Sequence, residues 1–440
     1  MPDYQGHNLN VDVEDVWETA VQNFPAMAEA YHSANNAVYH TTEVIPYDPD
    51  CEFMDRWQRV RDELISILGS SSMNIEDTAT ALRDAMTAYA QQDQAAAVAL
   101  NRAMKDLPEF VPELPPTKDP AGVAIRNPHS TQSWDPVGPD QLDRMYTGDA
   151  PTVEDLLARA QEVDDKLYEA DVASRSGLDG VLADIVPRSW VEGSAEGQYL
   201  FIVDLIRQSV RGNPSWYEQG IVALQDIADP VSASKPFGMF RTEVNIAKHA
   251  LDPDKWGGEA ASEFRSNFLD AYEDIAEAQA AVVSLLQSAL TGYKRALETT
   301  YRGYRDAMDA SIRACDSIIG GAAVAESSFE TAALQAVLTV GGIVATGGTT
   351  ALTQTAGMFS LANSGVSIAS SQYVAGGGDV GTVHENLVKT VNAIKGKLED
   401  FDLQLADGLR QDLVVIEDLR MQDRVIDLPR PNFADEPTLF

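Results

Sequence analysis

The feature that most constrains this chain is the length over which apolar residues keep helical spacing. One such stretch runs from Glu259 toward Ile318. Its large apolar residues fall on one helix face; they are Phe264, Phe268, Tyr272, Ile275, Val282 and Leu286. A helix this long and this one-sided has to lie beside other long helices. The stretch therefore indicates an elongated bundle.

A second long stretch, from about Val383 to Met421, carries a heptad pattern. Its apolar residues alternate steps of four and three; they are Leu387, Val391, Ile394, Leu398, Phe401 and Leu405. The pattern slips at Gly408-Leu409 and continues toward Leu413 and Ile416. Heptad spacing predicts that this helix packs along a seam on another helix, from the same chain or from another subunit.

Shorter helices account for much of the remaining chain. We expect helices over about 13–38, 53–68, 75–104, 199–210 and 239–250, and another that begins after Pro151 with Thr152 as its N-cap. Gly69-Ser70-Ser71-Ser72 reads as a turn that joins two helices into a hairpin. No convincing series of alternating strands appears. The predicted fold class is all-α, an elongated antiparallel helical bundle with an additional C-terminal helical region.

Three segments interrupt the helical pattern and suggest the domain organisation. Residues 107–139 contain eight prolines and read as a linker. Residues 331–378 contain no charged residue and are rich in Gly, Ala, Ser and Thr, and residues 428–440 read as a loose tail. The expected regions are 1–105, a linker at 106–149, 150–310, an Ala/Gly-rich segment at 311–378 that contains the uncharged stretch, and 379–440. Residues 177–236 form a less regular stretch of unassigned role.

The charge balance excludes several partners. The chain has 68 acidic and 32 basic residues, a net charge of -36. Nucleic-acid binding and docking on anionic lipid both need clustered Lys and Arg, so neither is expected. The N-terminus lacks the basic start and apolar stretch of a secretory signal. We therefore expect a soluble protein made in the cytoplasm, which leaves the cell, if it does, without a cleaved leader.

No constellation of catalytic or ligand-binding residues is apparent. The six histidines are scattered, and no nucleophile elbow, phosphate-binding loop or zinc-ligand pair occurs. Cys51 and Cys315 lie 264 positions apart and are either two free thiols or one long-range disulfide. The sequence therefore predicts a protein that is not an enzyme and has no cofactor or metal site.

Two short features remain. Tyr89 and Asp93 stand four positions apart near the end of a helix, so they share one face. Trp256-Gly257-Gly258 lies between two predicted helices, where the glycines allow a tight reversal. Taken singly, Tyr89 is an ordinary residue at the edge of a core. Trp256 either packs on the hairpin end or offers its ring to a partner.

Together these features resemble the bipartite signal of ESX (type VII) secretion substrates, Y-x-x-x-D after a helical pair and W-x-G between two helices. The surrounding residues resemble the EspB group, which fuses PE-like and PPE-like helical regions, over roughly residues 12–105 and 150–310. The Y-x-x-x-D helix of that group is matched from Leu82 to Leu100, and its W-x-G-x-A-A turn by Trp256, Gly258, Ala260 and Ala261. The chain departs from the group at 177–236 and in its C-terminal third.

The resemblance implies that Tyr89, Asp93, Trp256 and Gly258 meet at one tip of the bundle as a secretion signal. It implies recognition by the type VII secretion ATPase, a dedicated chaperone, and export without a cleaved signal peptide to the cell envelope or beyond. The leading hypothesis is a non-enzymatic secreted protein that acts through self-assembly, as a homo-oligomer, and through protein contacts.

The alternatives concern the C-terminal third. A membrane-active or pore-forming effector would insert the uncharged segment at 331–378, although glycine pairs divide it into pieces too short for ordinary spans. The same segment also fits a buried helical hairpin or a flexible loop. A delivery domain for a toxin is the third hypothesis, but too little chain follows residue 378 for a catalytic domain.

Overall fold

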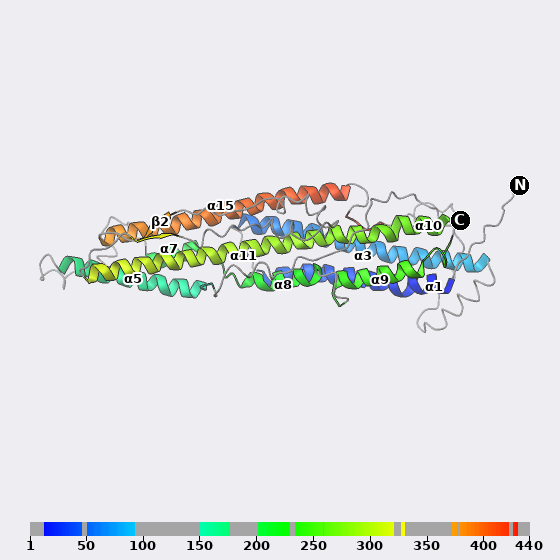
Figure 1. Ribbon diagram of the computed structural model, residues 1–440, viewed down its shortest axis with the longest axis horizontal. Coiled ribbons are helices and arrows are strands. Elements are labelled where there is room, and N and C mark those ends of the chain that lie inside the picture. Colours follow the sequence, from blue (N-terminus) through cyan, green and yellow to red (C-terminus); the bar gives the residue numbers. More distant parts are fainter. Residues whose placement is uncertain are drawn as a thin grey trace.

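The computed structural model describes residues 13–45, 51–92, 150–176, 201–228, 234–257, 259–320, 327–330, 372–375, 379–421 and 426–429. These residues form an elongated helical bundle, which confirms the predicted all-α class (Figure 1). In chain order the helices are α1 (Val13–Glu18), η1 (Thr19–Asn23), α2 (Phe24–Val44), α3 (Glu52–Gln92), α5 (Val153–Ser176), α7 (Ile202–Ser209), α8 (Trp216–Ala228), α9 (Pro236–Ala250), α10 (Glu259–Phe264), η4 (Arg265–Leu269), α11 (Asp270–Ile319) and α15 (Val380–Met421).

The central element is α11, whose 50 residues make a rod of about 75 Å. Helices α3, α5, α8, α9 and α15 all pack against it. All six apolar residues that marked the predicted buried face of this stretch are buried. Gly303 lets α15 come close, because a Cβ at this position would lie 3.3 Å from Ile394 Cδ1. The expected division at residue 310 falls within α11, and those near 105 and 149 fall outside the described residues.

The N-terminal part is a helical pair, but its turn is not where the sequence indicated. Helix α3 is continuous from Glu52 to Gln92, so the turn predicted at residues 69–72 was wrong. Its small residues mark a close helix approach instead. Ser71 is fully buried and its Oγ lies 2.8 Å from the Gln279 Nε2 that donates to it, while Ser72 Oγ donates to the Ala28 carbonyl at 3.1 Å. The pair is therefore formed by α2 and α3.

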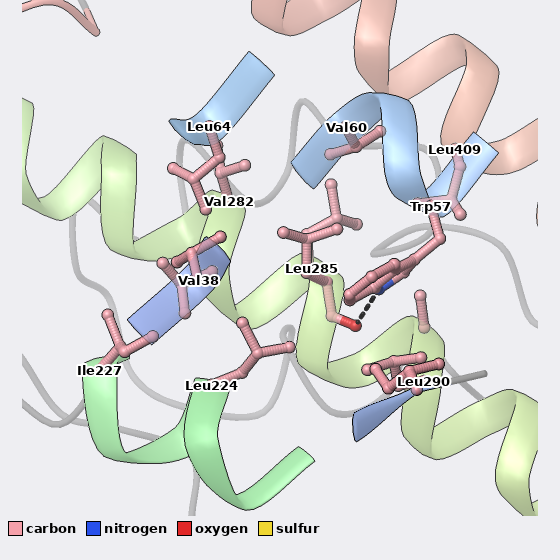
Figure 2. Packing of buried hydrophobic residues seen from close by; sticks show 14 of the residues in the cluster. Val38, Trp57, Val60, Leu64, Leu224, Ile227, Val282, Leu285, Leu290 and Leu409 are labelled. Atoms are coloured by element: carbon pink, nitrogen blue, oxygen red, sulfur yellow. Dashed lines mark hydrogen bonds between the residues drawn. The ribbon is translucent and has the colours of Figure 1, made fainter. Parts of the chain in front are cut away.

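The core between these helices is closely interdigitated. Figure 2 shows Trp57, Val60 and Leu64 of α3 facing residues of α11, with α2, α8 and α15 contributing further side chains. The buried indole of Trp57 donates from Nε1 to the Leu286 carbonyl at 3.0 Å, so its polar atom is satisfied inside the core.

The heptad helix packs within its own chain. All six predicted seam residues of α15 are at most 1% exposed, and they face α11 and α3. The prediction of a packed seam is thereby confirmed, and its partner is in cis. Beyond the helix, Ile426 and Leu428 return to the core, where Gln279 and Asn74 donate side-chain hydrogen bonds to their carbonyls. The start of the predicted tail is therefore packed on the core and hydrogen-bonded to it.

The uncharged stretch is bounded by a short ladder. Strands β1 (Ser327–Glu330) and β2 (Gln372–Ala375) pair antiparallel, with Ser327 opposite Ala375 and Glu330 opposite Gln372. This ladder was not predicted, since two isolated runs of four residues, Ser-Ser-Phe-Glu and Gln-Tyr-Val-Ala, are too short to give a clear strand pattern. Residues 331–371 lie outside the described part of the chain. Within the described part, no helix is long and apolar enough to cross a membrane.

Candidate functional site

The two halves of the expected signal converge on one end of the bundle. The last turns of α3, which include Tyr89, lie at the same end as the connection between α9 and α10, which includes Trp256 (Figure 1). Asp93 and Gly258 lie outside the described residues, as does the side chain of Tyr89. The structure therefore brings the two elements to one end, and the contact among the four side chains stays a prediction.

A compact turn leads from α9 to Trp256. Helix α9 ends at Ala250, before Asp252-Pro253-Asp254, because proline disfavours helical conformation in the residue before it. Asp252 then organises the turn: its carbonyl accepts from the backbone N–H groups of Lys255 and Trp256, each at 2.9 Å. Its side chain accepts from the backbone N–H of Asp254 at 3.1 Å. The position of Trp256 is thus fixed by hydrogen bonds within the turn.

The ring of Trp256 packs on the hairpin end, as one of the two sequence interpretations held. It is 7% exposed and lies against Phe264, with ring centroids 5.4 Å apart. Phe264 in turn contacts Phe24 and Phe268. Arg265 donates a hydrogen bond to the Trp256 carbonyl. A partner that binds this turn would therefore contact its backbone, because the indole of Trp256 is almost fully buried.

The N-terminal helix is tied to the same turn. Lys255 Nζ lies 2.6 Å from Asp15 Oδ2, so α1 is joined to the α9–α10 connection by an ion pair. Phe24 contacts Tyr272 of α11, and the Tyr272 hydroxyl donates to Thr78 Oγ1 of α3 at 3.2 Å. These contacts connect the turn to α3, about three helical turns before Tyr89. The end of the bundle is therefore one packed unit.

Sequence reasoning missed a buried polar centre in the middle of the bundle. Asp402 of α15 is 4% exposed and accepts from the backbone N–H groups of Glu52 and Phe53, at 3.3 and 3.1 Å. Its carboxylate thereby caps the N-terminus of α3, where the helix dipole favours negative charge. Arg211, in the connection between α7 and α8, pairs with it at 3.2 Å.

The signal for this centre was present in the sequence. Asp402 lies four positions after Leu398 and three before Leu405, so it stands on the apolar seam itself. A carboxylate at such a position needs a buried partner. Arg211 could not be identified from spacing, because its place depends on Gly212, which has a φ of 74°, and on the Tyr301 hydroxyl, which accepts from the Arg211 backbone N–H at 3.0 Å.

A thiol completes this centre. Cys51 Sγ lies 3.1 Å from Asp402 Oδ1 and 3.2 Å from the Tyr293 hydroxyl. Burial and the neighbouring Asp402 raise the pKa of the Cys51 thiol to about 12. Burial, and then Cys51, also raises the pKa of Tyr293 well above its ordinary value. A thiol held protonated is a poor nucleophile, so Cys51 is not suited to thiol chemistry. The contacts of the centre instead join the start of α3 to α11, α15 and the α7–α8 connection.

Two further kinds of site, a disulfide and a cluster of metal-ligating side chains, are absent from the described part of the chain. Cys51 and Cys315 are both free and buried, so the alternative of a long-range disulfide was wrong. No group of three or more His, Cys, Asp or Glu side chains in the described ranges could hold a metal ion.

No protein family, curated protein or solved structure matches this chain.

Proposed function

We propose that this chain is a non-enzymatic substrate of a type VII (ESX) secretion system, which acts after export through self-assembly and protein contacts. The observation that carries the proposal is the common location of the last turns of α3 and the W-x-G turn at one end of an elongated helical bundle (Figure 1). Tyr89, Asp93, Trp256 and Gly258 would form the export signal there.

The packing of this end suggests how the signal would be read. Trp256 is packed on Phe264, and its turn is fixed by Asp252. The part offered to the secretion ATPase would then be the chain that follows Gln92, presented next to a rigid turn. A dedicated chaperone would cover the same end before export. The net charge of -36 argues against nucleic acid as a partner.

The test is export of signal variants from the organism that carries the gene. Asp93→Ala and Tyr89→Phe should lower the abundance of the protein in the culture filtrate without a comparable loss inside the cell. Tyr39→Phe, an exposed tyrosine of α2, and Glu385→Ala, an exposed carboxylate of α15, are matched controls. Melting temperatures of the purified variants separate export from folding. Normal melting with normal export of both signal variants would refute the proposal.

A second candidate function is favoured by the β1–β2 ladder. Because Glu330 pairs with Gln372, residues 331–371 of the uncharged segment at 331–378 start and end at the same place beside α11 and α15. A segment attached in this way could enter a membrane while the helices stay folded. Release of a dye from vesicles, compared between the full chain and a variant with 331–371 replaced by Asn-Gly, tests this. Equal release would exclude membrane insertion by this segment.

A further inference from the structure

Helix α15 carries a second heptad line on the side away from its buried seam. The line runs through eight positions separated by alternating steps of four and three; they are Gly396, Asp400, Leu403, Asp407, Arg410, Val414, Glu417 and Met421. We call it the outer seam. The seven positions from Asp400 onward are exposed, and α15 runs along one edge of the bundle (Figure 1). Heptad spacing on a free helix face is the pattern of a coiled-coil contact.

Three large apolar side chains lie on the outer seam. Leu403 is 55% exposed, Val414 is 52% exposed and Met421 is 76% exposed. Single exposed apolar residues are common on protein surfaces. These three share one line of one helix, spaced by eleven and seven residues, so they form one surface.

The outer seam is complementary to itself when it is reversed. A two-fold axis placed between Asp407 and Arg410 brings Leu403 opposite Val414 of a second copy. The same axis brings Asp407 opposite the partner's Arg410. It also brings Met421, the largest exposed side chain of the three, opposite Gly396, where an added Cβ would meet nothing within 4 Å. Each of these pairings occurs twice, as an isologous contact requires.

We propose that the outer seam is the interface of an antiparallel, two-fold dimer of this chain. This inference rests on the self-assembly part of the proposed function and names the surface that performs it. Asp407 and Arg410 already pair within one helix, with Arg410 Nη2 3.1 Å from Asp407 Oδ1. Across the axis, two such pairs form a ring of four alternating charges.

The charges also select the direction of pairing. In a parallel pair, Asp407 would face Asp407 and Arg410 would face Arg410, and both contacts are repulsive. The antiparallel pair has one unfavourable position, Asp400 opposite Glu417. Lys397, whose Nζ lies 3.9 Å from Asp400 Oδ2, stands one turn from this position and offsets its charge.

The interface is expected to be weak. The area that three apolar side chains per copy and a charged ring can bury is smaller than the roughly 800 Å² per partner of a standard stable interface. The net charge of -36 on each copy adds repulsion. The dimer should therefore dissociate in about the micromolar range, and its detection requires a concentration series.

Sedimentation of the purified chain in 0.15 M salt is the first experiment. The unsubstituted chain should move from monomer toward dimer as its concentration rises, and Leu403→Glu should weaken association at least tenfold. Val222→Glu is the matched control, since Val222 is 51% exposed on α8 and lies away from the outer seam. Both sites are exposed, so neither variant should melt earlier. A monomer at every concentration, or equal association of Leu403→Glu, would overturn the proposal.

Charge reversal and cross-linking test the direction. Arg410→Asp should weaken association, and addition of Asp407→Arg should restore it. Across an antiparallel pair, residue 410 lies about 4.5 Å along the axis from its own mate, whereas residue 421 lies about 38 Å from its mate. Arg410→Cys should therefore form a disulfide-linked dimer and Met421→Cys should not. Equal cross-linking at both positions would refute the antiparallel arrangement. Export of the signal variants is measured separately in the culture filtrate, so either proposal can fail alone.

Discussion

Replacement of Asp402 by alanine tests whether the buried polar centre holds the C-terminal helix to the rest of the bundle. The substitution removes the carboxylate that caps α3 and pairs with Arg211. Two backbone N–H groups of α3 lose their acceptor. The Arg211 guanidinium keeps its charge, because arginine stays protonated in proteins, and it loses its buried partner.

The size of the effect follows from these contacts. Removal of one partner of a buried ion pair costs about 3–5 kcal/mol, and loss of a helix cap costs about 1 kcal/mol. The Arg211 side chain is 17% exposed and has Glu399 as a second acidic neighbour at 3.7 Å, so part of its charge stays compensated. We therefore expect Asp402→Ala to lower the free energy of unfolding by about 3–4 kcal/mol.

Guanidinium unfolding, followed by circular dichroism, measures this change. Glu385→Ala is the control, because it removes an exposed carboxylate of the same helix that pairs with Lys389, a contact worth about 0.5 kcal/mol. A thiol reagent gives a second reading, since loss of Asp402 should speed the reaction of Cys51 more than that of Cys315. If Asp402→Ala cost no more than Glu385→Ala, the account of the centre would be wrong.

Three further predictions concern pH, thiols and the seam. Burial and the neighbouring Asp274 raise the pKa of Glu277 to about 7. The pKa in the folded state therefore lies above that in the unfolded state. The stability that this group contributes is present at low pH and is lost as the pH rises through about 7. Glu277→Gln should therefore raise the melting temperature at pH 8 more than at pH 5, and an equal shift at both would contradict this. Burial raises the pKa of Cys51 and of Cys315 to about 12. At pH 8 a thiol reagent should therefore react slowly with the folded chain and should titrate two thiols per chain after unfolding. Fast reaction of the folded chain would argue against burial of the thiols. Leu398→Ala should cost about 2–5 kcal/mol in denaturant unfolding, and a cost below about 1 kcal/mol would show that the buried seam of α15, from Leu387 to Leu405, is not tightly packed.

Periodic features could be predicted from the sequence, and features that depend on distant contacts could not. The spacing of Leu387 to Leu405 determined both the helix and its buried face. The turn expected at residues 69–72 failed because glycine and serine have two uses, to end a helix or to let another helix approach. Which use applies at Ser71 depends on Gln279, which lies 208 positions away.

The candidate site shows the same division. The order of the two expected signal elements in the chain could be predicted, since both are local patterns around Tyr89 and Trp256. That α3 runs on to Gln92 and ends at the same end of the bundle as the α9–α10 connection depends on the packing of α1, α3 and α11 together. Asp402 was visible as an anomaly in an apolar seam, but its partners come from two other segments, residues 51–53 and Arg211, so sequence spacing could not supply them.

The β1–β2 ladder bears on how the sequence between its two strands can evolve or be engineered. Because the two strands pair over four residues, the separation of Glu330 and Gln372 does not depend on the length of the sequence between them. The entropy of closing such a loop rises only about 0.6 kcal/mol for each doubling of its length. The entropy of loop closure alone therefore tolerates large changes in the length of the 41 residues between the two strands.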